Sequence, residues 1–255
     1  MKLFKLHLLF CIILVSQIKV TVISIGDRFQ VDSIEHEILV NTILLYNNNE
    51  DIKIEYIIDT LSSFDAVLNK LKNSSDENKN SMFGLASITR TKARKVFFDF
   101  SSVYIPAKEV VTTLKVNSHL VLSDLKNQRV GYQSKSIEEI SINRLQKSID
   151  LIPIGYLHYA DKTKALKEGN IKFAIDDNIS VWDSEEITII HDLEVQNGDG
   201  IAIAYPKGSI LRAKLDKYLN YYLNSARFYR FIQTKYGIDI ARYFKKELRL
   251  LNKDF

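Results

Sequence analysis

Cysteine and proline are scarce in this chain of 255 residues, which contains one cysteine, Cys11, and three prolines. A lone cysteine excludes a disulfide within the chain. No Gly-x-Gly-x-x-Gly or other glycine-rich phosphate-binding motif occurs, so nothing indicates a nucleotide cofactor. His36, His119, His158 and His191 are scattered without metal-ligand spacing. We therefore expect neither a metal ion nor a cofactor.

A strong excess of charge is also missing. The formal net charge is +4, and no block of like charge interrupts the sequence. Because nucleic-acid binding depends on clustered lysine and arginine, we expect no nucleic-acid partner. A hydrophobic content of 46% is that of an ordinary globular protein with one large domain or two small ones.

The N-terminal residues are typical of a secretory signal peptide, which we assign to residues 1–19. Lys2 and Lys5 are followed by an uninterrupted apolar run at residues 8–15. This run is too short to span a bilayer, and the alternative is a buried first strand or helix. Phe10 precedes Cys11 where a lipid-anchored cysteine needs a small residue. We therefore expect a periplasmic protein that carries no lipid and, once mature, no cysteine.

Strand and helix patterns alternate along the chain in two rounds, followed by a helical tail. After Ser63, for example, Phe64, Val67, Leu68 and Leu71 are apolar at helical spacing. Strands are expected at residues 20–25, 52–59, 82–86, 97–100, 109–114, 129–132, 151–154, 171–175, 187–191 and 201–204. Helices are expected between most of these strands and at residues 209–223, 227–236 and 240–250. This alternation predicts an α/β fold with crossover helices.

Residues 84–104 are the most informative segment. An apolar strand ends in Ser87 and Thr89, a short basic turn closes with Arg94, and an aromatic strand follows. Hydroxyls, backbone N–H groups and one guanidinium would thus surround a single point. A guanidinium presents two parallel donors to a carboxylate, so we predict a carboxylate site at Arg94. The alternative is a solvated helix arginine.

This segment resembles the solute-binding proteins of family 3, which capture amino acids for bacterial ABC importers. Their motif is matched without a gap by Ser87, Ile88, Thr89, Thr91, Arg94, Phe100, Ser101 and Tyr104. The resemblance implies a two-lobed, type II periplasmic-binding-protein-like α/β fold with two crossing segments and a helical tail packed on the first lobe. We accordingly assign residues 20–111 plus 199–255 to lobe 1 and 112–198 to lobe 2, with crossings near Thr112 and Gly198.

The same resemblance implies a function without catalysis. A monomer would capture a small polar solute, expected to be an amino acid, between its lobes and present it to an ABC permease in the membrane. Arg94 would clamp the ligand carboxylate, with Thr89 and Ser87 beside it.

Two positions of lobe 2 would complete the site that the resemblance implies. Ser136, in the loop of residues 133–136, would extend the carboxylate cradle, and Asp177 would hold the ligand ammonium. Both have structural alternatives, because Ser136, and Asp177 together with Asp176, could simply cap the helices that follow.

Two departures from the family leave other functions open. The usual Pro-Pro-Phe stretch is absent, and Phe29 could supply its aromatic ring or belong to the core. Lys135 replaces a usual glycine, which is costly if the backbone there needs a positive φ. One alternative is a member that serves as a sensor or interaction protein. Another is an enzyme similar to cyclohexadienyl dehydratase, with Asp176 or Glu138 as its general acid.

The leader gives a first prediction. The exported protein should lack its first 16 to 24 residues, because cleavage follows the short apolar run and its small residue Ser16. Intact-mass analysis of secreted protein measures both the new N-terminus and any acylation. A retained N-terminus, or a lipid on Cys11, would contradict the assignment.

Overall fold

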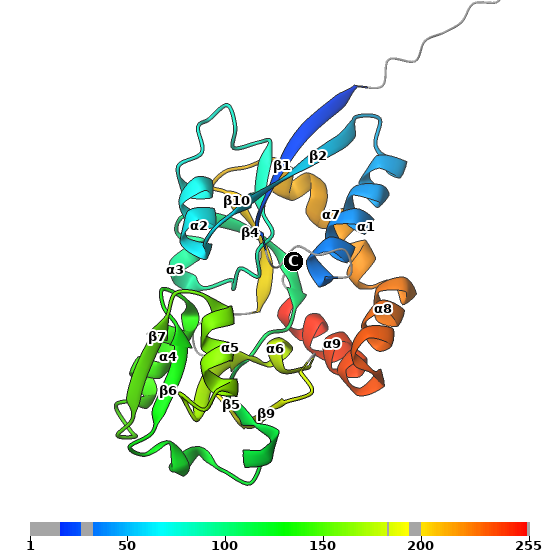
Figure 1. The fold of residues 1–255 in the computed structure, drawn as a ribbon. Coiled ribbons are helices and arrows are strands. Elements are labelled where there is room, and N and C mark those ends of the chain that lie inside the picture. Colours follow the sequence, from blue (N-terminus) through cyan, green and yellow to red (C-terminus); the bar gives the residue numbers. More distant parts are fainter. Residues whose placement is uncertain (1–15, 27–32, 183, 194–199, 254–255) are drawn as a thin grey trace, which may run out of the picture.

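The computed structural model describes residues 16–26, 33–182, 184–193 and 200–253. These residues form two five-stranded sheets, each with helices on both faces, which lie one above the other in Figure 1. We call the first sheet with its helices the first lobe, and the second sheet with its helices the second lobe. The predicted alternation of strands and helices is therefore present in both halves of the fold.

The first sheet has the strand order β2-β1-β3-β10-β4. Strand β1 (Gln17–Ile25) runs parallel to β2 (Lys53–Leu61) and to β3 (Met82–Gly84). Strand β10 (Ile201–Pro206) returns late in the chain and lies antiparallel between β3 and β4 (Phe98–Ile105). The C-terminal part of the chain is thereby fixed to the first lobe.

Helices cover the first sheet on both faces. Helix α2 (Phe64–Lys72) begins at Ser63, whose hydroxyl accepts the Ala66 N–H at 3.2 Å, and it buries Val67 and Leu71 against one face. The other face carries α1 (Ile34–Asn49), α7 (Leu211–Leu223), α8 (Ala226–Tyr236) and α9 (Ile238–Leu251). The short helix α3 (Lys92–Lys95) precedes β4. The predicted packing of the helical tail on the first lobe is therefore observed.

The second sheet has the strand order β7-β6-β8-β5-β9. Its strands are β5 (Glu109–Leu114), β6 (Arg129–Gln133), β7 (Ile152–Tyr156), β8 (Phe173–Asp177) and β9 (Ile187–Asp192). Helix α4 (Ile137–Leu145) packs on one face, and α5 (Tyr159–Lys167) and α6 (Asn178–Trp182) pack on the other. Two 3-10 turns, Lys115–Asn117 and Leu122–Leu125, join β5 to β6.

The chain passes between the sheets at residues 106–108 and again between Asp192 and Ile201. The first crossing is earlier than predicted, because Thr112 lies inside β5 and pairs with Ala174 of the second sheet. Residues 109–111, which we assigned to lobe 1, belong to the second sheet, since each of them pairs with β8. Gly198, near which we predicted the second crossing, lies outside the described residues.

Strand β1 also begins earlier than predicted. Gln17 pairs with Lys53, so residues 17–19, which we assigned to the leader, extend the first sheet. Cleavage directly after Ser16 would leave this strand whole. The rest of the expected leader, residues 1–15, lies outside the described residues. In the described part of the chain, no helix has both the length and the apolar content that crossing a membrane requires.

Gly200, at the end of the second crossing, gives a prediction about stability. Its φ is +104°, and an added Cβ would lie 2.7 Å from the carbonyl oxygen of Ile105. Gly200→Ala should therefore lower the free energy of unfolding by about 1–3 kcal/mol, measured by urea denaturation. The control is Gly169→Ala, where φ is +74° but no atom lies within 4 Å, and about 1 kcal/mol is expected. Equal losses would show that the contact with Ile105 has no effect.

Candidate functional site

A cavity of about 700 Å³ lies between the two lobes. Its walls are formed mainly by residues at the ends of strands and at the ends of helices, and several of them are polar. The first lobe contributes Ile25, Ser33, Ile34, Glu35, Ser62, Ser63, Phe64, Ser87, Ile105, Ile201, Lys235 and Tyr236, and the second contributes Gln133, Leu157, His158, Tyr159, Ala160, Asp177, Ile179 and Ser180. A small polar molecule held here would contact both lobes at once.

Ser87 and Glu35 form the first polar pair of the wall. The Ser87 hydroxyl donates to Oε1 of Glu35 at 2.6 Å, although 52 residues separate the two in sequence. Ser87 has a φ of 52°, in the left-handed region that costs energy for a residue with a Cβ. The strained backbone turns the chain after β3 toward the first turn of α1, where Glu35 lies 7% exposed. This pair places a carboxylate on the first-lobe wall.

Arg94 is held at the edge of the cavity by its own lobe. Its Nη1 donates to the carbonyl oxygen of Thr89 at 2.9 Å, and its guanidinium lies 4.9 Å from the ring centre of the lining residue Phe64. Burial lowers the pKa of Arg94 to about 10, while the nearby carboxylate of Asp177 acts in the opposite direction. Arg94 therefore stays charged at neutral pH and lies near an acidic residue of the other lobe.

Asp177 ends β8 and lies on the second-lobe wall. Its neighbour across the sheet is Glu109 of β5, which is 9% exposed and accepts the Ser141 hydroxyl at 2.8 Å. Burial raises the pKa of Glu109 to about 8, with Asp177 and Glu138 adding to the effect and the Ser141 hydroxyl opposing it. Glu109 is therefore mainly neutral at pH 7, which weakens its repulsion of Asp177.

The loop after β6 contains the positive φ that was predicted to be costly for Lys135. Lys135 has a φ of 60°, where glycine is favoured, so the lysine is strained. Ser136 caps α4, because its hydroxyl accepts the Glu138 N–H at 3.1 Å and donates to the Gln133 carbonyl at 2.7 Å. The Lys135 ammonium extends across to the first lobe and pairs with Asp65 of α2 at 2.9 Å. The strained residue thus links the two lobes.

Comparison with known proteins identifies the fold. No protein-family model matches the chain. Over 141 residues it is 29% identical to the arginine-binding extracellular protein ArtP of Bacillus subtilis (strain 168), a match that covers 53% of this chain and 55% of that protein. The chain thus aligns with about half the length of this relative. The arginine-, lysine- and histidine-binding protein ArtJ of Geobacillus stearothermophilus superposes with a TM-score of 0.67 at 19% identity, over 88% of this chain and 99% of that one.

The chain has the two-lobed type II periplasmic-binding-protein fold. A further structure with this arrangement is the ancestral amino-acid-binding protein AncCDT-1, described as a precursor of cyclohexadienyl dehydratase. It superposes with a TM-score of 0.64 at 14% identity, over 86% of this chain and 95% of that one. The predicted fold class is confirmed by these structures. The match to ArtP likewise confirms the resemblance to family-3 solute-binding proteins.

The type II fold brings some of the predicted site residues together and separates others. Ser87 and Asp177 line the cavity from opposite lobes, and Arg94 contacts its Phe64 wall. Thr89 and Ser136 do not belong to the described lining. The carbonyl oxygen of Thr89 accepts from Arg94, and the Ser136 hydroxyl donates to the carbonyl oxygen of the lining residue Gln133. Phe29 lies outside the described residues.

Several wall residues were not predicted from the sequence. Glu35 follows the helix cap Ser33 by two residues, and this cap signal alone could have placed it at a helix N-terminus facing the site. Tyr159 begins α5 shortly after the end of β7, and the neighbouring strand β8 ends at Asp177. Lys235 and Tyr236 come from the end of α8, far along the chain, and no local pattern marks them as cavity residues.

The pair of Lys135 and Asp65 gives a prediction about lobe closure. Lys135→Glu or Asp65→Lys alone should open the cavity, because each places like charges across it, and the double exchange should restore closure. Spin labels on Asp76→Cys and Lys147→Cys, one exposed site in each lobe, report the distance between the lobes. The difference in distance between the single variants and the wild-type protein should disappear in 1 M salt, because the Debye screening length there is only about 3 Å. Unchanged distances in the single variants would show that the pair does not restrain the lobes.

Proposed function

We propose that this protein is an extracytoplasmic solute-binding protein that captures an amino acid for an ABC importer. The observation that carries the proposal is the cavity between the lobes. Asp177 lines it from the second lobe, and the half-buried Arg94 lies against its first-lobe lining residue Phe64. An α-amino acid carries a carboxylate and an ammonium on the same carbon, and the charges of Arg94 and Asp177 complement them. Binding would therefore draw the two lobes together around the ligand.

In this proposal the ligand carboxylate binds Arg94, with the N-terminal end of α2 after Ser63 as a further donor. The Ser87 hydroxyl lies beside this site but gives its proton to Glu35. Anions are favoured at helix N-termini because the backbone N–H groups there lack partners within the helix. The ammonium binds Asp177. Glu35 adds a second carboxylate to the wall, so amino acids with a cationic side chain are the first to test. The relatives ArtP and ArtJ, which bind such amino acids by name, agree with this choice.

The setting of the protein follows from the same proposal. We place it in the periplasm after removal of the leader, as a monomer whose closed form is recognised by a membrane permease. The name of ArtP, an extracellular protein, supports a location outside the cytoplasm.

We also propose that the protein is not an enzyme. Asp176 and Glu138, the candidates for a general acid, both pair with Lys162 inside the second lobe and are absent from the described cavity lining. A carboxylic acid held in this way cannot reach a substrate in the cavity. The role of a sensor or interaction protein remains the second candidate. Lys135 favours it, because its strained backbone lies in the loop that was expected to complete the carboxylate cradle.

Calorimetric titration with arginine, lysine, histidine, glutamine and glutamate tests the proposal. Arg94→Ala should weaken binding by about 2–5 kcal/mol, because the ligand carboxylate would be left unpaired in the closed cavity. Asp177→Asn should weaken amino acids strongly but affect the same compounds without the α-ammonium little, since asparagine keeps the shape and loses the charge. The control is Arg242→Ala, whose side chain is 69% exposed and pairs with Asp239 alone among the described residues.

Two results would contradict the proposal. If the wild-type protein binds no amino acid, the second candidate, a sensor or interaction protein, takes its place. If Arg94→Ala and Arg242→Ala bind equally well, the ligand does not use the Arg94 site. Asp176→Asn is unsuitable as a control for Asp177→Asn, because Asp176 faces away from the cavity but belongs to a buried ion cluster.

A further inference from the structure

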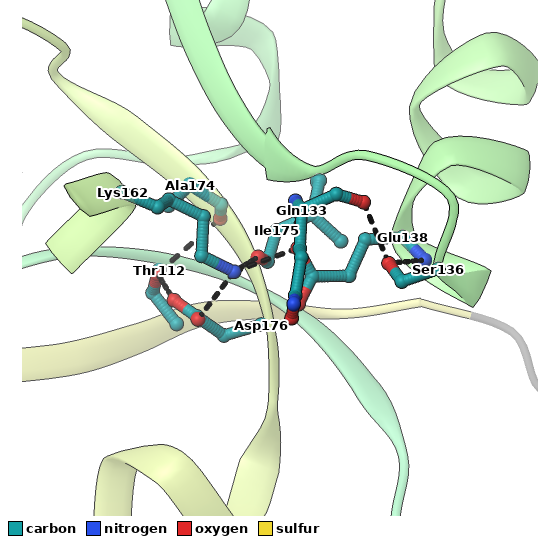
Figure 2. A network of polar contacts seen from close by, with 8 residues as sticks. All are labelled: Thr112, Gln133, Ser136, Glu138, Lys162, Ala174, Ile175 and Asp176. Atoms are coloured by element: carbon teal, nitrogen blue, oxygen red, sulfur yellow. Dashed lines mark hydrogen bonds and ion pairs between the residues drawn. The ribbon is translucent and has the colours of Figure 1, made fainter. Parts of the chain in front are cut away.

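Lys162 is a fully buried lysine beneath the cavity wall of the second lobe. Its side chain leaves α5 and is 1% exposed, and its ammonium lies between α4 and the ends of β6 and β8 (Figure 2). An isolated ammonium in such a place would cost several kcal/mol. A lysine retained there must be compensated by its neighbours, and the identity of these neighbours indicates what it does.

The Lys162 ammonium has three partners. It contacts Oε2 of Glu138 at 2.6 Å and Oδ1 of Asp176 at 2.9 Å, and it donates to the carbonyl oxygen of Ile175 at 2.6 Å. Burial opposes the charge on Lys162, but the two carboxylates outweigh it and raise its pKa above the ordinary value. Burial raises the pKa of Glu138 to about 7, although Lys162 acts against this shift. The cluster is therefore held together by the one cation between two acids.

The two carboxylate partners of Lys162 are connected to different parts of the cavity wall. Oε2 of Glu138 also accepts the backbone N–H of Gln133, a lining residue at the end of β6 (Figure 2). Oδ2 of Asp176 accepts the Thr112 hydroxyl at 2.6 Å, which ties the end of β8 to β5. Asp177, on the wall, is the next residue after Asp176. The ammonium thus connects two segments of the second-lobe wall, the end of β6 and the end of β8.

The second lobe packs closely around the stem of this lysine. On β6, a Cβ added to Gly131 would lie 3.3 Å from Cγ of Lys162 and 2.4 Å from Cδ1 of Ile171. A buried ion cluster adds little to stability compared with apolar side chains of the same volume, since desolvation offsets the attraction. Stability alone is therefore a poor reason for this arrangement, and its geometry points to the wall.

We propose that Lys162 is a positioning residue that fixes Gln133 and Asp177 in their binding geometry before a ligand arrives. The inference rests on the proposed amino-acid site, which it deepens. A wall that is already ordered loses less conformational freedom when a ligand binds, and the ligand is then held more tightly.

The test removes the charges while keeping the volume. The triple variant Lys162→Met, Glu138→Gln, Asp176→Asn has no unpaired charge and should melt close to the wild-type temperature. Lys162→Met alone leaves two buried carboxylates together and should melt much lower. The matched control is Lys164→Met on the same helix, whose side chain is 71% exposed. Hydrogen exchange over residues 129–140 without ligand, and calorimetric titration with arginine, are the two further measurements.

The triple variant is expected to exchange amide protons in residues 129–140 at least about tenfold faster and to bind arginine about tenfold more weakly, at a wild-type melting temperature. Wild-type exchange in this segment would overturn the inference. So would unfolding of the triple variant, because the cluster would then serve the fold as a whole. If the wild-type protein binds no amino acid, the proposed function fails, and the exchange measurement alone decides whether Lys162 orders the wall.

Discussion

The cavity depends on the contact that holds α6 of the second lobe against the C-terminal helices of the first. The Trp182 ring centre lies 6.0, 5.8 and 5.6 Å from those of Tyr236, Tyr243 and Phe244. Such tilted and edge-on aromatic pairs add attraction beyond the area that they bury. The Tyr243 hydroxyl also donates to the carbonyl oxygen of Pro106, at the first crossing. The contact therefore joins both lobes to the segment that connects them, and places Tyr236 on the wall.

The aromatic contact is placed to act as the pivot of the lobe closure that the proposed function requires. Lys135 and Asp65 join the lobes again near Ser63 and Phe64, on a part of the wall away from Tyr236. The aromatic contact is apolar and insensitive to salt, whereas the ion pair is exposed and screened by it. One connection is therefore suited to persist while the other forms and breaks. The strained φ of Lys135 is consistent with a residue whose side chain pairs with Asp65 of the other lobe.

Local patterns in the sequence predicted most of the secondary structure. Helix α4 has the bounds of residues 137–145 that its pattern predicts, and Ser63, one of two serines that could cap α2, is its cap. The alternation in β2 predicted the strand and placed Ile54 and Ile58 on one face, but it could not predict how deeply each is buried. Ile54 is 4% exposed, but Ile58 is 41% exposed, and β2 lies at the edge of the first sheet. Edge position is a property of the sheet and cannot be read from one strand.

The candidate site was harder to predict than the fold, because the role of each residue depends on contacts with residues far along the chain. Arg94 and Ser87 belong to a continuous motif, and the sequence could indicate them. Lys162 looks like any solvated lysine of a charged helix, and its partners Glu138 and Asp176 lie 24 and 14 residues away. Glu109 begins an apolar strand without any sign that it faces Asp177.

Asp176 and Asp177 show how the sheet converts adjacent residues into separate functions. Successive side chains on a strand point to opposite faces, so the end of β8 supplies one carboxylate to the cavity and one to the interior. The interior carboxylate needs a cation, which α5 supplies as Lys162, and that cation in turn binds Glu138 beside the other wall segment. The buried charge of Asp176, which would be costly without a partner, thereby helps to fix the position of Asp177. The aspartate that lines the cavity and the buried ion cluster are, on this argument, structurally linked.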